Sequence, residues 1–193
     1  MKAVLLEVPE HLLEERRRTG VDRFDEVWEG VLHMVPAPSG PHQRLGLRLA
    51  VTLVPLAEER GLVASLETNL ARPGTVASDY RVPDLAFYRR ENASEFGIEG
   101  RAELAVEILS PNDETYDKLG FYADVEVQEL LVIHPGTCAV ELFVLGDGRL
   151  EFATPDADGR SWSGALGVSF STAPVPALRV EWPGGSRLVT GEV

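Results

Sequence analysis

Three charged residues in the middle of the sequence, Asp84, Glu107 and Lys118, have side chains suited to one kind of chemistry. The two carboxylates lie in apolar runs of strand type, Val82–Phe87 and Leu104–Leu109. Carboxylate oxygens are ligands that suit Mg²⁺ or Mn²⁺, and a lysine nearby can lie over the same surface. These residue types favour a site for a divalent metal ion.

The spacing within the two runs predicts where the carboxylates point. Side chains alternate across a strand, so Asp84 shares a face with Ala86. By the same rule Glu107 shares a face with Ala105. If the two strands are neighbours, as consecutive strands usually are, the carboxylates converge over small alanines and leave room for an ion. Two like charges on a half-buried surface are costly without a cation, which favours a metal site.

The same residues also fit a purely structural interpretation. The chain has 31 acidic residues, so two carboxylates on neighbouring strands can arise without any function. Lys118 can be a solvated cation paired with Glu114, one helical turn earlier. Against this, only two of the 18 basic residues are lysines, so lysine is not the usual surface cation of this chain.

Charge and composition exclude several classes of protein. The chain of 193 residues is 44% hydrophobic and 25% charged, which is typical of one folded domain, here predicted over residues 1–193. Its net charge of −13 excludes a protein that coats nucleic acid, because a polyanion would be repelled. A single cysteine, Cys138, excludes an intramolecular disulfide and indicates a reducing compartment. The N-terminal residues lack the apolar core of a signal peptide and no run is long enough to span a membrane, so we expect a cytoplasmic protein.

Local patterns predict an α+β fold with a central mixed β-sheet flanked by helices. Helices are expected in the N-terminal segment 1–22 over Pro9–Arg18, from Ser39 to Gly61, and from Ser110 to about Ala123. A hairpin is expected over Phe24–Val35, and further strands over Leu62–Leu70, Arg81–Tyr88, Glu103–Leu109, Leu130–Ile133, Val140–Leu145 and Leu150–Ala153. Arg89–Arg101 is predicted to be a polar connection, and residues 156–193 an irregular tail with some strands.

A series of motifs links these elements to a known family. In chain order they are Glu26 with Gly30, His42, Pro83-Asp84, Val106–Pro111, Asp113, Lys118, Tyr122 and Gln128–Val132. Together they resemble the PD-(D/E)XK nuclease superfamily, and within it the Uma family of bacterial restriction-endonuclease-like proteins. The resemblance covers about residues 20–150, and its most specific part runs from Glu107 to Tyr122.

The resemblance implies a restriction-endonuclease-like core and a Mg²⁺- or Mn²⁺-dependent endonuclease that acts on nucleic acid, most simply DNA. Asp84 and Glu107 would bind the metal, with the backbone carbonyl of Ile108 as a further ligand. Position 109 is leucine where the simplest superfamily pattern has its lysine, so the resemblance implies that Lys118 takes that catalytic role.

Two other candidate site residues have competing interpretations. His42, at a helix start where the dipole disfavours its charged form, is a candidate catalytic residue in contact with substrate or metal, or a capping or packing histidine. Glu26 is a candidate outer metal ligand, or a solvated carboxylate at the end of a hairpin.

Partners and rival functions follow from the same reasoning. The least acidic segment suggests a nucleic-acid contact surface formed by Arg44, Arg48, Arg60 and Arg72. We expect a homodimer or larger homo-oligomer, which would close a groove around the substrate. The net charge also favours an alternative, a nuclease-fold binding or scaffold protein without activity. A carboxylate-pair glycosidase is the weakest candidate, because it needs aromatic platforms and none of Trp28, Trp162 and Trp182 is adjacent in sequence to the carboxylate strands.

Overall fold

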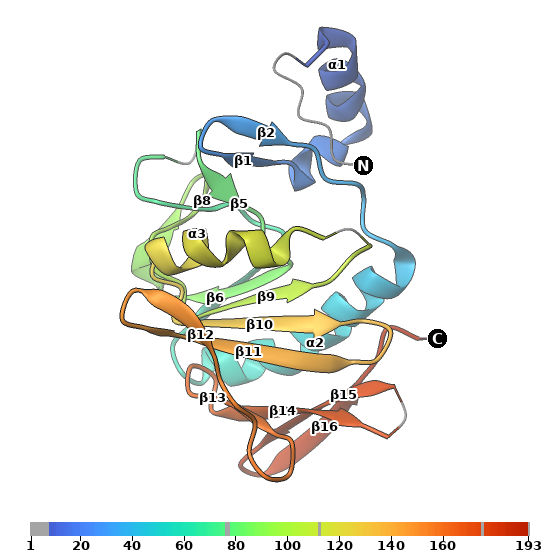
Figure 1. Ribbon diagram of the computed structural model, residues 1–193, viewed down its shortest axis with the longest axis vertical. Helices are drawn as coiled ribbons and strands as arrows, with labels where there is room; N and C mark the ends of the chain where they lie inside the picture. Colours follow the sequence, from blue (N-terminus) through green and yellow to red (C-terminus); the bar gives the residue numbers. More distant parts are fainter. Residues whose placement is uncertain (1–7, 76–77, 112, 175, 193) are drawn as a thin grey trace.

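Three sheets and three α-helices form an α+β fold, as the sequence predicts, in a computed structural model that describes residues 8–75, 78–111, 113–174 and 176–192. Figure 1 shows the central sheet in the middle of the molecule, with α3 (Leu119–Asp124) on one side and the C-terminal sheet beyond the other. None of the helices in the described ranges is long and apolar enough to cross a membrane.

The central sheet is mixed, as predicted, and has six strands in the order β12-β11-β10-β9-β6-β3. β9 and β10 pair in parallel, and the other neighbours pair antiparallel. Its strands are β3 (Val63–Leu66), β6 (Leu85–Tyr88), β9 (Leu104–Ile108), β10 (Glu129–His134), β11 (Ala139–Gly146) and β12 (Arg149–Phe152). The β11–β12 turn holds Asp147 and Gly148 at positive φ, the geometry of a two-residue hairpin turn.

The predicted pairing of the two carboxylate strands is confirmed. Leu85 lies opposite Val106, and Ala86 lies opposite Ala105. Leu85 and Val106 belong to the core cluster that faces α2, whereas the two alanines belong to the cluster on the opposite face, with α3. Asp84 precedes Leu85 and Glu107 follows Val106, so alternation places both carboxylates on the face of the two alanines.

Helix α2 (Gly40–Glu58) covers the first face of the central sheet. It begins as predicted, because Ser39 caps it by accepting a hydrogen bond from the backbone N–H of His42 at 3.4 Å. Leu45, Leu49 and Leu53 recur at helical spacing and are fully buried. The N-terminal α1 (Glu10–Thr19) also forms where the sequence predicts a helix.

A second sheet of short strands differs from the sequence prediction. Its order is β2-β1-β5-β4-β8-β7, formed by β1 (Glu26–Trp28), β2 (Val31–His33), β4 (Leu70–Ala71), β5 (Tyr80–Arg81), β7 (Ala93–Ser94) and β8 (Gly97–Glu99). The β1–β2 hairpin is predicted correctly, but the expected strands 62–70 and 81–88 each divide between two sheets. Glu67 adopts a positive φ that ends β3, and Pro83 lacks the N–H of a ladder residue. Asp84 therefore lies at a bend just before β6 and not inside a strand.

The predicted helix from Ser110 to Ala123 begins later than expected. A 3₁₀ turn covers Thr115–Lys118, and α3 follows it. The carboxylate of Asp113 accepts hydrogen bonds from the backbone N–H groups of Ser110 and Thr115, both at 2.8 Å. These local bonds compete with helical ones, so no helix begins at Ser110. Asn112, which was part of that predicted start, lies outside the described residues.

The C-terminal region is more regular than the predicted tail. It forms an antiparallel sheet of β13 (Ser161–Ser163), β14 (Val168–Ala173), β15 (Ala177–Trp182) and β16 (Gly185–Val189). Phe170 and Val180 are fully buried in the same core cluster as α2. Small and polar residues between these apolar positions conceal the strands in the sequence.

Three of the four arginines of the predicted basic contact surface have partners within the chain, whereas Arg60 makes no side-chain hydrogen bond or ion pair among the described residues. Arg44 donates to the carbonyl of Gly191 at 3.0 Å, and Arg48 donates to those of Thr190 and Glu192 at 2.8 Å each. Both arginines thus attach the C-terminal segment to α2. Arg72 forms ion pairs with Asp79 and Asp124.

The core between α2 and the central sheet can be tested with two leucines of the same helix. Leu49→Ala should lower the free energy of unfolding by about 2–5 kcal/mol, because it removes a fully buried side chain and leaves a cavity. Leu47→Ala, at a position 59% exposed, should change it by less than about 0.5 kcal/mol. Urea denaturation followed by circular dichroism measures both values. Equal effects would contradict this packing.

Candidate active site

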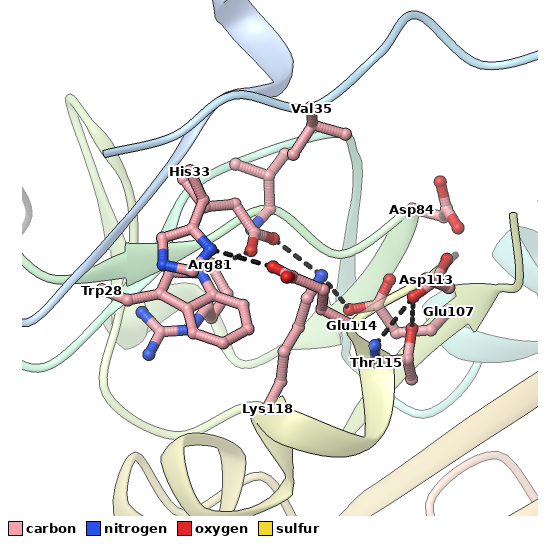
Figure 2. A network of polar contacts seen from close by, with 12 residues as sticks. Trp28, His33, Val35, Arg81, Asp84, Glu107, Asp113, Glu114, Thr115 and Lys118 are labelled. Atoms are coloured by element: carbon pink, nitrogen blue, oxygen red, sulfur yellow. Dashed lines mark hydrogen bonds and ion pairs between the residues drawn. The ribbon is translucent and has the colours of Figure 1, made fainter. Parts of the chain in front are cut away.

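The predicted carboxylates meet at one end of the central sheet. The β6–β9 register, continued by one residue, places Asp84 opposite Glu107. Asp84 Oδ2 accepts a hydrogen bond from the backbone N–H of Ile108 at 2.7 Å, which holds the bend before β6 against the end of β9. Figure 2 shows Asp84 and Glu107 on the same side of the site.

Lys118 joins this pair from the start of α3. Its Nζ lies 2.8 Å from Glu26 Oε1 and 3.0 Å from Glu107 Oε1, and Figure 2 shows its side chain extending toward Glu107. The side chain of Lys118 is only 10% exposed. The interpretation of Lys118 as a solvated cation is therefore wrong, and Glu114 instead contacts His33 Nδ1 at 2.9 Å.

Two donors orient the carboxylate of Glu107. Lys118 Nζ and the hydroxyl of Tyr122 both donate to Glu107 Oε1. Tyr122 is fully buried, and sequence reasoning did not assign it to the site. Its spacing of four residues from Lys118 was the available signal, because residues i and i+4 of a helix share a face. With Oε1 held in this way, Oε2 of Glu107 has no hydrogen-bond partner among the described residues.

Burial and the neighbouring charges shift the pKa values of Glu107 and Lys118. Burial raises the pKa of Glu107 to about 7; the cation of Lys118 opposes this rise, and the charges of Asp84 and Glu26 add to it. Burial would lower the pKa of Lys118, but Glu107 and Glu26 raise it well above its ordinary value. Lys118 is therefore protonated at neutral pH, and the raised pKa of Glu107 reflects burial together with three neighbouring carboxyl groups, Glu26, Asp84 and Glu107, beside one lysine.

Glu26 is buried in the structure and is not a solvated carboxylate at a hairpin end. Its Oε1 accepts from Lys118 and from the backbone N–H of Val82 at 2.9 Å. Its Oε2 accepts from the indole N–H of Trp28 at 2.7 Å. Both oxygens of Glu26 thus have partners, and the arrangement makes it the second carboxylate that holds Lys118.

Trp28 adjoins the site, contrary to the prediction from its place in the sequence. Besides its bond to Glu26, its ring stacks on His33 with centroids 4.0 Å apart. The guanidinium of Arg81 lies over the Trp28 ring, 4.4 Å from its centroid. Trp28 therefore orients Glu26 from the β1–β2 hairpin. This contact accounts for its position without a role in binding sugar.

His42 reaches the site from the first turn of α2. Its Nε2 lies 2.9 Å from the carbonyl oxygen of Ile108 and 3.3 Å from Asp84 Oδ2. A carbonyl only accepts, so this nitrogen carries a hydrogen and holds the two oxygen-bearing groups together. Burial lowers the pKa of His42, but the hydrogen bond and charge of Asp84, with smaller contributions from the Ile108 carbonyl and Asp113, together raise it above its ordinary value. The expected bias against the charged imidazole is therefore overturned by Asp84.

The donor set of this site fits a divalent metal ion. Asp84 Oδ1, Glu107 Oε2 and the second lone pair of the Ile108 carbonyl are oxygen donors at the same end of β9. Such donors suit Mg²⁺ or Mn²⁺, and the excess negative charge around Glu107 favours a cation. The described residues contain no cluster of three or more His, Cys, Asp or Glu side chains placed to hold a metal. A metal here would therefore rest on two carboxylates and one backbone carbonyl.

Comparison with known proteins agrees with the motifs. A family model described as "Uma2: Putative restriction endonuclease" matches residues 14–178. The chain belongs to the Uma2 family. The resemblance predicted from the motifs is thereby confirmed, and no curated protein matches the chain.

The fold is similar to that of a solved structure. It is described as a putative nuclease belonging to DUF820 from Anabaena variabilis, and it is similar to 70% of this chain over 78% of its own length. The TM-score is 0.56 at 18% sequence identity. A likeness at that identity shows a shared fold and says nothing about the residues of the site.

The ion pairs of Lys118 predict a large and pH-dependent effect on stability. Lys118→Met should lower the free energy of unfolding by about 3–5 kcal/mol at pH 8, because Glu26 and Glu107 stay buried without their cation. The folded pKa of Glu107, already about 7 against 4.5 for a free carboxyl, should rise further. A carboxyl with a raised folded pKa favours the folded state as pH falls, so the deficit should shrink between pH 8 and pH 5.

Denaturant titrations at several pH values measure this effect. Arg149→Met is a matched control, because it removes an exposed cation paired with Glu151 and should cost no more than about 1 kcal/mol at any of these pH values. A Lys118→Met deficit that is small, or that does not change with pH, would show that the buried pairing is wrong.

Proposed function

We propose that this Uma2-family chain is a divalent-metal-dependent endonuclease that hydrolyses phosphodiester bonds in DNA. The observation that supports it best is the buried contact of Lys118 with Glu107, beside Asp84 at the bend that precedes the neighbouring strand β6. Two oriented carboxylates and one protonated amine are the groups that this reaction needs. The description of the Uma2 family points to the same class of enzyme.

Asp84, Glu107 and the carbonyl of Ile108 are the groups that would hold Mg²⁺ or Mn²⁺. When bound, such an ion lowers the pKa of a water ligand and polarises the scissile phosphate. His42 keeps the Ile108 carbonyl and Asp84 in place through one N–H group. Tyr122 keeps Glu107 in the orientation that leaves Oε2 free.

Lys118 is the residue that acts on the substrate itself. An ammonium group has three N–H donors, and Glu26 and Glu107 occupy two of them. The third is available to a phosphoryl oxygen or to the attacking water. Because both carboxylates keep Lys118 protonated, it would stabilise negative charge as it builds on the phosphate.

The net charge of −13 shapes how DNA would approach. A bound divalent ion and the arginines outside the site would have to offset repulsion of the phosphates. A homodimer that closes a groove around the duplex is part of this proposal. The same charge favours a second candidate, a nuclease-fold protein that binds a partner and does not cleave.

Plasmid nicking separates the two candidates. The wild-type protein with Mg²⁺ or Mn²⁺ should convert supercoiled plasmid to open circles, and EDTA should abolish the conversion. Asp84→Asn should lower the rate at least about 100-fold, because the loss of one carboxylate charge weakens metal binding. Gel electrophoresis over time measures the rate.

Asp117→Asn is the matched control. Asp117 is an exposed carboxylate next to Lys118 in sequence, so its loss should leave the rate unchanged while the net charge changes equally. Equal nicking by wild type and Asp84→Asn would overturn the catalytic assignment. Metal-independent binding of a partner without any cleavage would support the non-catalytic candidate instead.

A further inference from the structure

A polar pocket lies at the end of the central sheet opposite to the carboxylate site. Its volume is about 290 Å³, and its lining includes Arg60, Arg89 and Arg101 together with Glu103 and Glu129. Glu103 precedes β9 and Glu107 lies near its end, so four residues of strand, roughly 13 Å, separate the two regions along the sheet. The loop between β13 and β14 forms another part of the wall.

The first acidic residue of the pocket is already occupied. Glu103 accepts two hydrogen bonds from Arg101, from Nε and Nη2, each at 3.0 Å. Arg89 Nε lies 3.4 Å from the same carboxylate. One carboxylate thus holds two guanidinium groups side by side, and each of them keeps further N–H donors that point elsewhere.

The second acidic residue is occupied as well. Glu129 accepts a hydrogen bond from the hydroxyl of Ser163 and two more from the backbone N–H groups of Gly164 and Ala165, at 2.8 and 3.1 Å. Its oxygens face the β13–β14 loop and join that loop to the start of β10. Neither acidic residue of the pocket therefore has an oxygen without a partner.

Arg60 adds a third guanidinium without a matching acceptor. Across the described ranges it makes no side-chain hydrogen bond or ion pair, although it lines the pocket. Its guanidinium lies against Gly167, at φ +65°, where a Cβ would collide with it. Because Gly167 has no side chain, the guanidinium of Arg60 can lie against the backbone there.

We propose that this pocket binds a small molecule through a phosphate group. Three arginines line one pocket in which both carboxylates already have partners, so their remaining N–H donors are open to an acceptor from outside the chain. Arginine forks match the geometry of phosphate oxygens. The pocket is at the small end of the range for ligand sites, which suits a phosphate with a small attached group and not a nucleic-acid strand. This proposal does not rest on the nuclease activity.

Isothermal titration calorimetry with inorganic phosphate tests the pocket. EDTA keeps divalent ions from the carboxylate site, and chloride keeps the ionic strength constant. The wild type should bind one phosphate per chain, and Arg60→Gln should weaken binding at least tenfold. Arg187→Gln, which removes an exposed arginine on β16, should bind as the wild type does.

A second variant tests the packing of Arg60 against Gly167 without changing the net charge of the protein. Gly167→Ala should displace the guanidinium and weaken phosphate binding to a similar degree, and circular dichroism checks that each variant is folded. No binding by the wild type, or equal binding by wild type and Arg60→Gln, would overturn the proposal. An oligonucleotide that binds through Arg60 while inorganic phosphate does not bind would also overturn it, because the ligand would then be a nucleic-acid strand.

Discussion

The buried ion pairs of Lys118 are the interaction on which the site depends. A buried ammonium group is stable only where its charge and its N–H donors are matched, and Glu26 and Glu107 supply that match. These residues come from the β1–β2 hairpin, from β9 and from the start of α3. One cation thereby ties the second sheet, the central sheet and a helix into a single arrangement. Loss of that cation would leave two buried carboxylates facing each other.

The position of Asp84 depends on an irregularity in the backbone. Between β5 and β6 the chain leaves one sheet for another, and Pro83 suits this break because it needs no ladder hydrogen bond. The bend frees the carboxylate of Asp84 from the strand and lets it accept the N–H of Ile108. His42 then joins the carbonyl of the same residue to Asp84 from α2.

The acidity of the chain has a different meaning once the contacts are known. Eleven acidic residues lie between positions 76 and 125, and several of them are held inside the molecule by cations or backbone N–H groups. Asp79 pairs with Arg81, and Glu103 pairs with Arg101. The buried members of this group therefore stabilise the fold, whereas others, such as Glu91 and Asp124, are exposed.

Sequence alone determined what depends on neighbouring residues: the faces of β6 and β9, the β1–β2 turn and the candidate set of Asp84, Glu107 and Lys118. Only the tertiary structure decided what depends on distant ones. Lys118 and Glu26 are 92 residues apart, so no local pattern could reveal that they meet in the core. The delayed helix start and the C-terminal sheet were also missed. The helix starts late because hydrogen bonds to the side chain of Asp113 replace the helical ones. The C-terminal strands form because burial against α2 stabilises them, although their polar residues weaken the strand pattern in the sequence.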